Sequence, residues 1–138
     1  MFHRIFLDTN ILLDVVLNRE LFVADTEKIF LLQDEGHLTI YVSALTLANV
    51  AHIVKRNGKD PYKVIESIIK WVEVVDLELN HFEKTLYSKF KDFEDGLQFF
   101  SASEINNIDA IITRDKSDFK TSTIPVYTPR EFLKHFNP

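Results

Sequence analysis

The feature that most constrains the fold is an alternation of short apolar, β-branched segments with segments of helical periodicity. Five segments have the composition of buried strands: Phe2–Leu7, Leu38–Val42, Val72–Leu77, Asp109–Thr113 and Ile124–Tyr127. Seven segments have helical patterns or caps: Asn10–Leu17, Ala24–Glu35, Ala44–Arg56, Pro61 to about Lys70, Asn80 to about Phe90, Phe93–Ile105 and Pro129–Phe136. This order predicts right-handed crossovers, and therefore an α/β fold with a parallel sheet of about five strands and helices on both faces.

Length and composition limit the class of protein. The 138 residues predict a single domain over 1–138, and a 46% hydrophobic content is enough for a core. The absence of cysteine excludes a disulfide scaffold, a thiolate nucleophile and a cysteine-ligated zinc site. No apolar run approaches the roughly 18 residues of a membrane span, so we expect a cytoplasmic protein that does not enter a membrane. A net charge of −5 argues against a globally basic nucleic-acid binder, although a nuclease can bind phosphates through metal ions.

Acidic residues stand where the predicted strands end. Asp8 directly follows the first strand, and Asp115 and Asp118 follow the fourth. Asp92 and Asp95 begin the helix that leads into the fourth strand. Ligands of open parallel sheets bind outside the carboxyl ends of strands, at the point where the strand order reverses. If the first and fourth strands are neighbours there, these carboxylates converge on one rim.

Converging carboxylates repel one another and raise each other's pKa values. A hard divalent cation relieves that repulsion, and oxygen-only ligands suit Mg²⁺ or Mn²⁺. Cations held in this way generate hydroxide from water and stabilise the transition state of phosphodiester cleavage. Four of these acids also have a structural interpretation. Asp8 or Thr9 can cap the helix at Asn10, Asp115 can cap the turn at 115–119, and Asp92 and Asp95 lie where a helix dipole favours acids. Their joint occurrence at strand ends favours a site.

Basic residues flank the acids. Lys91, Arg114 and Lys116 are the predicted RNA contacts, with Lys89 and Lys120 close by in the sequence. A solvated charged surface is the alternative interpretation of the same residues.

Four motifs taken together resemble the PIN domain, and in particular the VapC-like toxins and related bacterial PIN proteins. They are Asp8-Thr9-Asn10, the segment SALTLAN at 43–49, DFEDGLQ at 92–98 and ITRDKSDF at 112–119. The resemblance implies a three-layer α/β/α sandwich and a ribonuclease that depends on Mg²⁺ or Mn²⁺. It also implies a homodimer and, for a toxin, an antitoxin protein as partner.

Carried over to this sequence, the family pattern makes Asp8 the first metal ligand and Asp95 the acid of the later helix, with Asp92 as a second candidate. The last acid is Asp115 or Asp118, and the motif leaves that choice open.

The same pattern assigns supporting roles to polar neighbours. Thr113 and Asn10 would orient the carboxylates by hydrogen bonds. The family usually has Glu where this chain has Asn49, and an amide oxygen ligates a cation without adding negative charge.

Other functions remain open at this point. The Asn49 position favours a PIN-fold module that binds nucleic acid or protein with weak or no catalysis. A phosphatase of the haloacid-dehalogenase type also places Asp after its first strand, but it needs a second Asp where this chain has Asn10. In a receiver-like phospho-acceptor, the acids would lie on other elements.

Overall fold

The structure is a computed structural model that describes residues 3–136. Phe2, the predicted start of the first strand, lies outside the described residues. The strands are β1 (His3–Leu7), β2 (Leu38–Ser43), β3 (Glu73–Val75), β4 (Ala110–Ile112) and β5 (Val126–Tyr127). They form one sheet in the order β3-β2-β1-β4-β5, and all four pairings are parallel.

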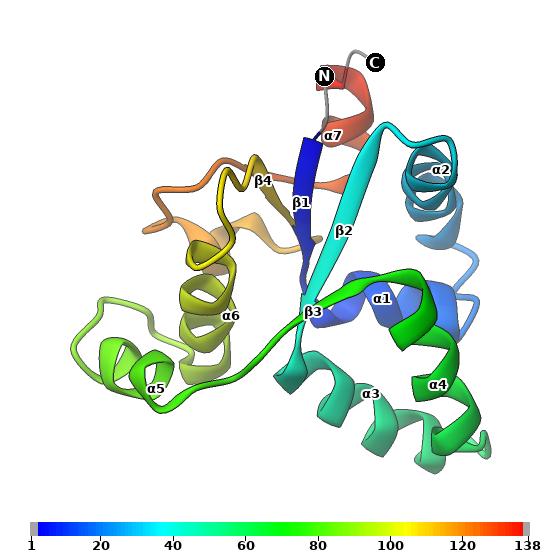
Figure 1. Cartoon of the computed structure of the whole chain (residues 1–138), viewed down its shortest axis with the longest axis horizontal. Helices are drawn as coiled ribbons and strands as arrows, with labels where there is room; N and C mark the ends of the chain where they lie inside the picture. Colours follow the sequence, from blue (N-terminus) through cyan, green and yellow to red (C-terminus); the bar gives the residue numbers. More distant parts are fainter. Residues whose placement is uncertain (1–2, 137–138) are drawn as a thin grey trace.

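Helices cover both faces of this sheet (Figure 1). They are α1 (Thr9–Val16), α2 (Val23–Asp34), α3 (Ala44–Arg56), α4 (Pro61–Trp71), α5 (Leu79–Leu86), α6 (Phe93–Ser103) and α7 (Pro129–His135), with a 3-10 helix η1 (Lys116–Phe119). Helices α5 and α6 lie on one side, whereas α1, α2, α3 and α4 lie on the other (Figure 1). The predicted three-layer α/β/α sandwich around a five-stranded parallel sheet is confirmed.

The central strand β1 shows why two separate cores form. Successive side chains of a strand point to opposite faces of the sheet. Ile5 and Leu7 enter the larger core, under α1 to α4 and α7, and Phe6 enters the smaller core beside Phe99 and Phe119. All three β1 side chains have no exposed surface, which explains why this strand is apolar on both faces.

Local capping sets several helix boundaries where the sequence predicts them. The Ser43 hydroxyl accepts a 3.1 Å hydrogen bond from the Thr46 N–H and begins α3. The Asp60 carboxylate accepts one of 2.9 Å from the Tyr62 N–H and begins α4. These contacts lie within three residues, so the sequence specifies them without help from the tertiary structure.

The prediction of a helix from Asn80 to about Phe90 is wrong at its end, because α5 ends at Leu86. The Ser88 hydroxyl donates to the Thr85 carbonyl and accepts from the Phe90 N–H, so it competes with the helical hydrogen bonds. Phe90 instead packs against the rings of Phe99 and Phe119.

Strand β3 is also shorter than the predicted Val72–Leu77. It is an edge strand, and only its three residues pair with β2. The 3-10 helix η1 lies in the predicted turn after β4 and was not expected as a helix. The other boundaries lie within two residues of the predicted ones, and both ends of α3 match.

The strand order places the switch point between β1 and β4. Strands β2 and β3 extend the sheet on one side of β1, and β4 and β5 extend it on the other. The carboxyl ends of β1 and β4 are therefore the expected location of a ligand site. Among residues 3–136, no helix combines the length and the apolar character needed to cross a membrane.

Candidate functional site

Asp8 lies at the carboxyl end of β1, and its carboxylate is held from two directions. Its backbone N–H donates to the Ile112 carbonyl (3.0 Å), which keeps the residue in register with β4. One carboxylate oxygen accepts from the Thr9 N–H (2.8 Å) and caps α1, and the other accepts from the Thr113 hydroxyl (2.9 Å). Asp8 is 9% exposed, so the carboxylate has little freedom to turn elsewhere.

The segment after β4 carries two further acids. The Thr113 hydroxyl accepts from the Asp115 N–H (3.1 Å), and the Ser117 hydroxyl donates to the Asp115 carboxylate (2.7 Å). The Asp118 N–H donates to the Asp115 carbonyl (3.2 Å), which begins η1. The Thr113 hydroxyl therefore connects Asp8, at the end of β1, to the acidic segment that follows β4.

Asp95 and Asp92 occupy the start of α6. The Asp92 carboxylate accepts from the Asp95 N–H (3.0 Å), so Asp92 caps the helix and lies beside the Asp95 side chain. Asp95 is half-buried, whereas Asp92 is exposed.

Two cavities meet at these acids. The larger, of about 420 Å³, is lined by Asp8, Asp95 and Asp118, and the smaller, of about 150 Å³, by Asp92, Asp95 and Asp118. Asp115 lines neither of the two cavities. Of the two candidates for the last acid, Asp118 is thus the one that faces both cavities.

The acids influence one another electrostatically. Burial, followed by the negative charges of Asp92, Asp118 and Asp8, raises the pKa of Asp95 to about 7. Burial also raises the pKa of Asp8, against the opposing effect of its hydrogen bonds from Thr113 and Thr9. The pKa of Asp118 is raised by partial desolvation and by the neighbouring charge of Asp115.

A bound cation would relieve this mutual repulsion. The acids among the lining residues offer carboxylates, which are hard oxygen ligands of the kind that Mg²⁺ and Mn²⁺ prefer. The chemistry of Asp8, Asp95 and Asp118 therefore suits a divalent metal ion, whereas the described residues whose ligand atoms already lie within 4.8 Å of one another are Glu78, His81 and Glu104.

A buried polar network underlies the site, and sequence reasoning missed it. Gln98 on α6 is 1% exposed. Its carbonyl oxygen accepts from the Ser43 hydroxyl (2.6 Å), and its amide donates to the hydroxyls of Thr9 (2.9 Å) and Thr46 (2.8 Å). Gln98 thus fixes α6, one turn after Asp95, to β2, α3 and α1. The available signal was a glutamine on the otherwise apolar face of a helix.

Two other predicted residues, Asn10 and Asn49, line the larger cavity together with Asp8. Asn49 is half-buried on α3, and Asn10 is exposed on α1. The neutral amide at position 49 therefore lies in the cavity that the acids share.

The three predicted RNA contacts have different surroundings. Lys91 lines the smaller cavity. The Arg114 guanidinium donates two hydrogen bonds to the buried Asp14 carboxylate (2.9 and 3.2 Å), and the Lys116 ammonium donates to Glu131 (3.1 Å). The structure therefore gives Arg114 and Lys116 ion-pair partners, and contact of these side chains with RNA stays a prediction.

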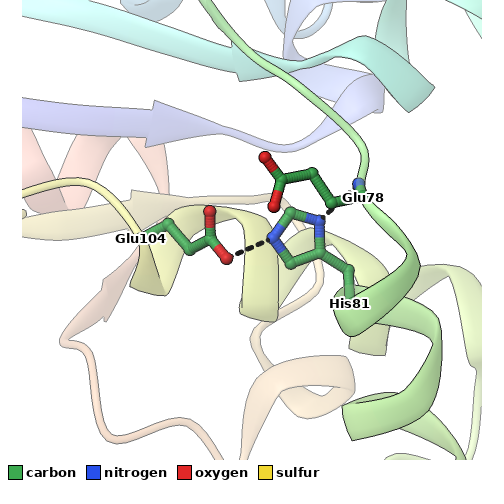
Figure 2. Close-up of side chains that lie close together, drawn as sticks. All are labelled: Glu78, His81 and Glu104. Carbon is green, nitrogen blue, oxygen red and sulfur yellow. Dashed lines mark hydrogen bonds and ion pairs between the residues drawn. The ribbon is translucent and has the colours of Figure 1, made fainter.

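A second group of metal-type ligands lies at the start of α5 and the end of α6 (Figure 2). Glu78, His81 and Glu104 each offer one ligand atom, and these atoms lie within 4.8 Å of one another. The His81 ring is fully buried, with Nδ1 accepting from the Glu78 N–H (3.0 Å) and Nε2 lying 2.8 Å from Glu104 (Figure 2).

The hydrogen bond to Nδ1 decides what this group does. A backbone N–H can only donate, so Nδ1 is the acceptor nitrogen and the proton of the neutral ring is on Nε2. That proton faces Glu104, and although the contact is short, it lacks the alignment of a good hydrogen bond. The hydrogen bond from Asn80 and, to a smaller extent, the proximity of His81 lower the pKa of Glu104. Since the protonated Nε2 of His81 has no lone pair to offer a metal, we interpret Glu78, His81 and Glu104 as a structural contact that holds α5 against the end of α6.

Comparison with known proteins gives one family. A family model described as a PIN domain matches residues 4–117. No curated protein sequence matches the chain.

Solved structures share the fold at low sequence identity. A chain of a toxin–antitoxin complex from Klebsiella pneumoniae superposes with a TM-score of 0.64 at 19% identity, over 90% of this chain and 96% of that one. VapBC2 from Rickettsia felis, bound to a DNA fragment from their promoter, gives a TM-score of 0.67 at 16% identity, with the same coverage of 90% and 96%. PAE2754 from Pyrobaculum aerophilum gives 0.58 at 12% identity and covers 97% of both chains. Because the family model spans most of the sequence and the acids lie at the switch point of a matching fold, the chain belongs to the PIN domain family.

Proposed function

We propose that this PIN domain is a ribonuclease that depends on Mg²⁺ or Mn²⁺ and is the toxin of a toxin–antitoxin pair. The observation that carries the proposal is the arrangement of Asp8, Asp95 and Asp118 around two adjoining cavities, with the pKa of each carboxyl raised by burial and by neighbouring acids. A group of carboxylates at one rim is costly unless a cation binds there.

Each residue has a distinct role in this proposal. Asp8, Asp95 and Asp118 hold the cation, and Thr113 and the Thr9 N–H fix the orientation of the Asp8 carboxylate. When bound, a divalent cation supplies an activated water and positive charge against the phosphodiester. Asp115 supports the loop that presents Asp118.

The direct test is cleavage of a mixed RNA with Mg²⁺ or Mn²⁺, with and without EDTA. We expect cleavage only with metal, and we expect Asp8→Asn to abolish it because the variant keeps the shape of the ligand but loses its charge. Asp34→Asn is the matched control. Asp34 is exposed at the end of α2, shortly before the amino end of β2, whereas the acids of the site follow the carboxyl ends of strands. Equal cleavage in EDTA would reject the metal mechanism.

A second function has one observation in its favour. Asn49 lies in the cavity with Asp8, Asp95 and Asp118, so the site has one fewer negative charge than the family pattern implies. A PIN module that binds nucleic acid or protein with weak or no catalysis is therefore the alternative, and RNA binding without cleavage would support it.

The antitoxin is supported by analogy with the two toxin–antitoxin complexes among the structural neighbours. A homodimer and a cytoplasmic location remain predictions from the sequence. Large apolar side chains that are exposed on α4 and at α5 support a protein partner, and they are Tyr62, Ile69, Leu79, Leu86 and Tyr87. Sedimentation of the chain alone would separate a second copy from an antitoxin as the protein that covers them.

A further inference from the structure

We infer that single-stranded RNA crosses the acidic site between two sets of cations. His52 and Arg56 hold backbone phosphates on one side, and Lys89, Lys91 and Lys120 hold them on the other. The inference rests on the proposed nuclease function and adds to it the path of the substrate and an internal position for the cleaved bond.

The two cavities provide the path. The larger and the smaller cavity have Asp95 and Asp118 in common, so they adjoin each other at the acids. A strand that occupies both cavities would pass directly over these carboxylates. The phosphate nearest to the acids would then have further nucleotides on each side.

The larger cavity has its cations on α3. Asn49, His52, Ile53 and Arg56 all line it, and their spacing of three and four residues places them on one face of the helix. The side chains of His52 and Arg56 are exposed, and neither takes part in an ion pair within residues 3–136. Arg56 and, when protonated, His52 are therefore available to a phosphate.

The smaller cavity has its cations on two loops. Lys89 and Lys91 come from the segment between α5 and α6, and Lys120 comes directly after η1. All three are exposed, and none has an ion-pair partner among the described residues. In contrast, Arg114 and Lys116 nearby are held by Asp14 and Glu131.

The negative charge of the whole protein makes RNA binding depend on these unpaired basic side chains. With a net charge of −5, the chain does not attract RNA at long range, and the acids of the site repel phosphates. Binding then depends on local cations that offset this repulsion on both sides of the acids. Cations on both sides also favour cleavage within a strand over removal of a terminal nucleotide.

The test measures RNA binding separately from cleavage. Fluorescence anisotropy of a labelled 12-nucleotide unstructured RNA, titrated over a range of salt concentrations, gives the number of phosphates neutralised, at about 0.7 in log–log slope for each one. We expect Lys89→Gln/Lys91→Gln/Lys120→Gln to reduce the slope by about 2, and His52→Gln/Arg56→Gln by about 1. Lys28→Gln/Lys63→Gln/Lys134→Gln removes the same charge from α2, α4 and α7 and should leave the slope unchanged.

Cleavage provides a second readout. For the unmodified protein, extending a short RNA on either side of the cleaved bond should lower KM. In each multiple variant, extension on the side of the substituted residues should no longer lower KM, whereas extension on the other side should still do so, with kcat preserved. If the chain binds RNA through these five residues but does not cleave it, the proposed nuclease function fails and the inferred path stands. If it cleaves RNA and the variants behave like the control, the path is overturned. A chain that binds no RNA would overturn both.

Discussion

The hydroxyl of Thr113 donates a 2.9 Å hydrogen bond to the carboxylate of Asp8, across 105 positions of sequence. The same hydroxyl accepts from the N–H of Asp115. Thr113 is fully buried, so one small side chain holds the first acid and the acidic loop in a fixed relation.

Replacing Thr113 with Val should weaken the metal site while keeping the side-chain shape. The Asp8 carboxylate would lose a hydrogen bond that orients it, and such a loss typically costs about 10- to 100-fold in metal affinity. Titration calorimetry with Mn²⁺ measures the change, and Thr113→Ser should retain the affinity because it keeps the hydroxyl. A folded Thr113→Val variant with normal Mn²⁺ affinity would show that the hydrogen bond does not serve the metal.

The stability of the metal-free protein should fall as the pH rises from 5 to 8. The pKa of Asp95 is raised from 3.8 to about 7 in the folded state, so the folded state binds this proton more tightly than the unfolded state does. The contribution of Asp95 to the free energy of unfolding is therefore fully present below pH 3.8 and is lost as the pH rises through about 7.

Urea unfolding at several pH values, with EDTA present, measures this effect. Asp95→Asn should flatten the pH dependence, whereas Asp34→Asn should not. Because Mg²⁺ competes with the proton for the same carboxylates, it should raise Tm more at pH 8 than at pH 5. A pH dependence identical in Asp95→Asn and in the unmodified chain would contradict the assignment.

Asn49→Glu should tighten Mn²⁺ binding and increase any cleavage rate. The substitution adds a negative charge to the cavity that Asp8, Asp95 and Asp118 line. In the metal-free protein the same charge adds repulsion, so we expect lower stability without metal and a larger gain in Tm with Mn²⁺. Calorimetry on both forms measures the affinity, and an unchanged value in a folded variant would remove Asn49 from the site.

The Glu78–His81–Glu104 group should stabilise the fold without binding metal. His81→Leu removes the acceptor for the Glu78 N–H and the contact with Glu104, and each lost partner of a buried polar group costs about 1–3 kcal/mol. Thermal unfolding with added Mn²⁺ or Zn²⁺ separates the two candidate metal locations. Asp8→Asn should abolish the metal-induced rise in Tm, whereas Glu104→Gln should leave it intact, and the reverse result would place the metal at His81.

Much of the fold is predictable from the sequence because it depends on neighbours a few residues apart. The apolar segment before Asp8 predicts a central strand, and Ser43 and Asp60 predict the starts of α3 and α4 through caps that close within three residues. The end of α5 was predicted too late, because Ser88 and the packing of Phe90 ended the helix against its local pattern. The four motifs were sufficient to indicate the family.

The sequence alone determined the order of strands and helices, and it indicated the acids of the candidate site, because strand ends and helix starts are marked by local patterns. The tertiary structure decided which side chains meet. Asp118 rather than Asp115 faces the cavities, Gln98 joins three hydroxyls beneath them, and Arg114 is held by Asp14, 100 positions away. The physical reason is that a hydrogen bond or ion pair between distant segments depends on how the helices pack on the sheet, and that packing must give hydrogen-bond partners to the buried polar groups of the whole molecule at once.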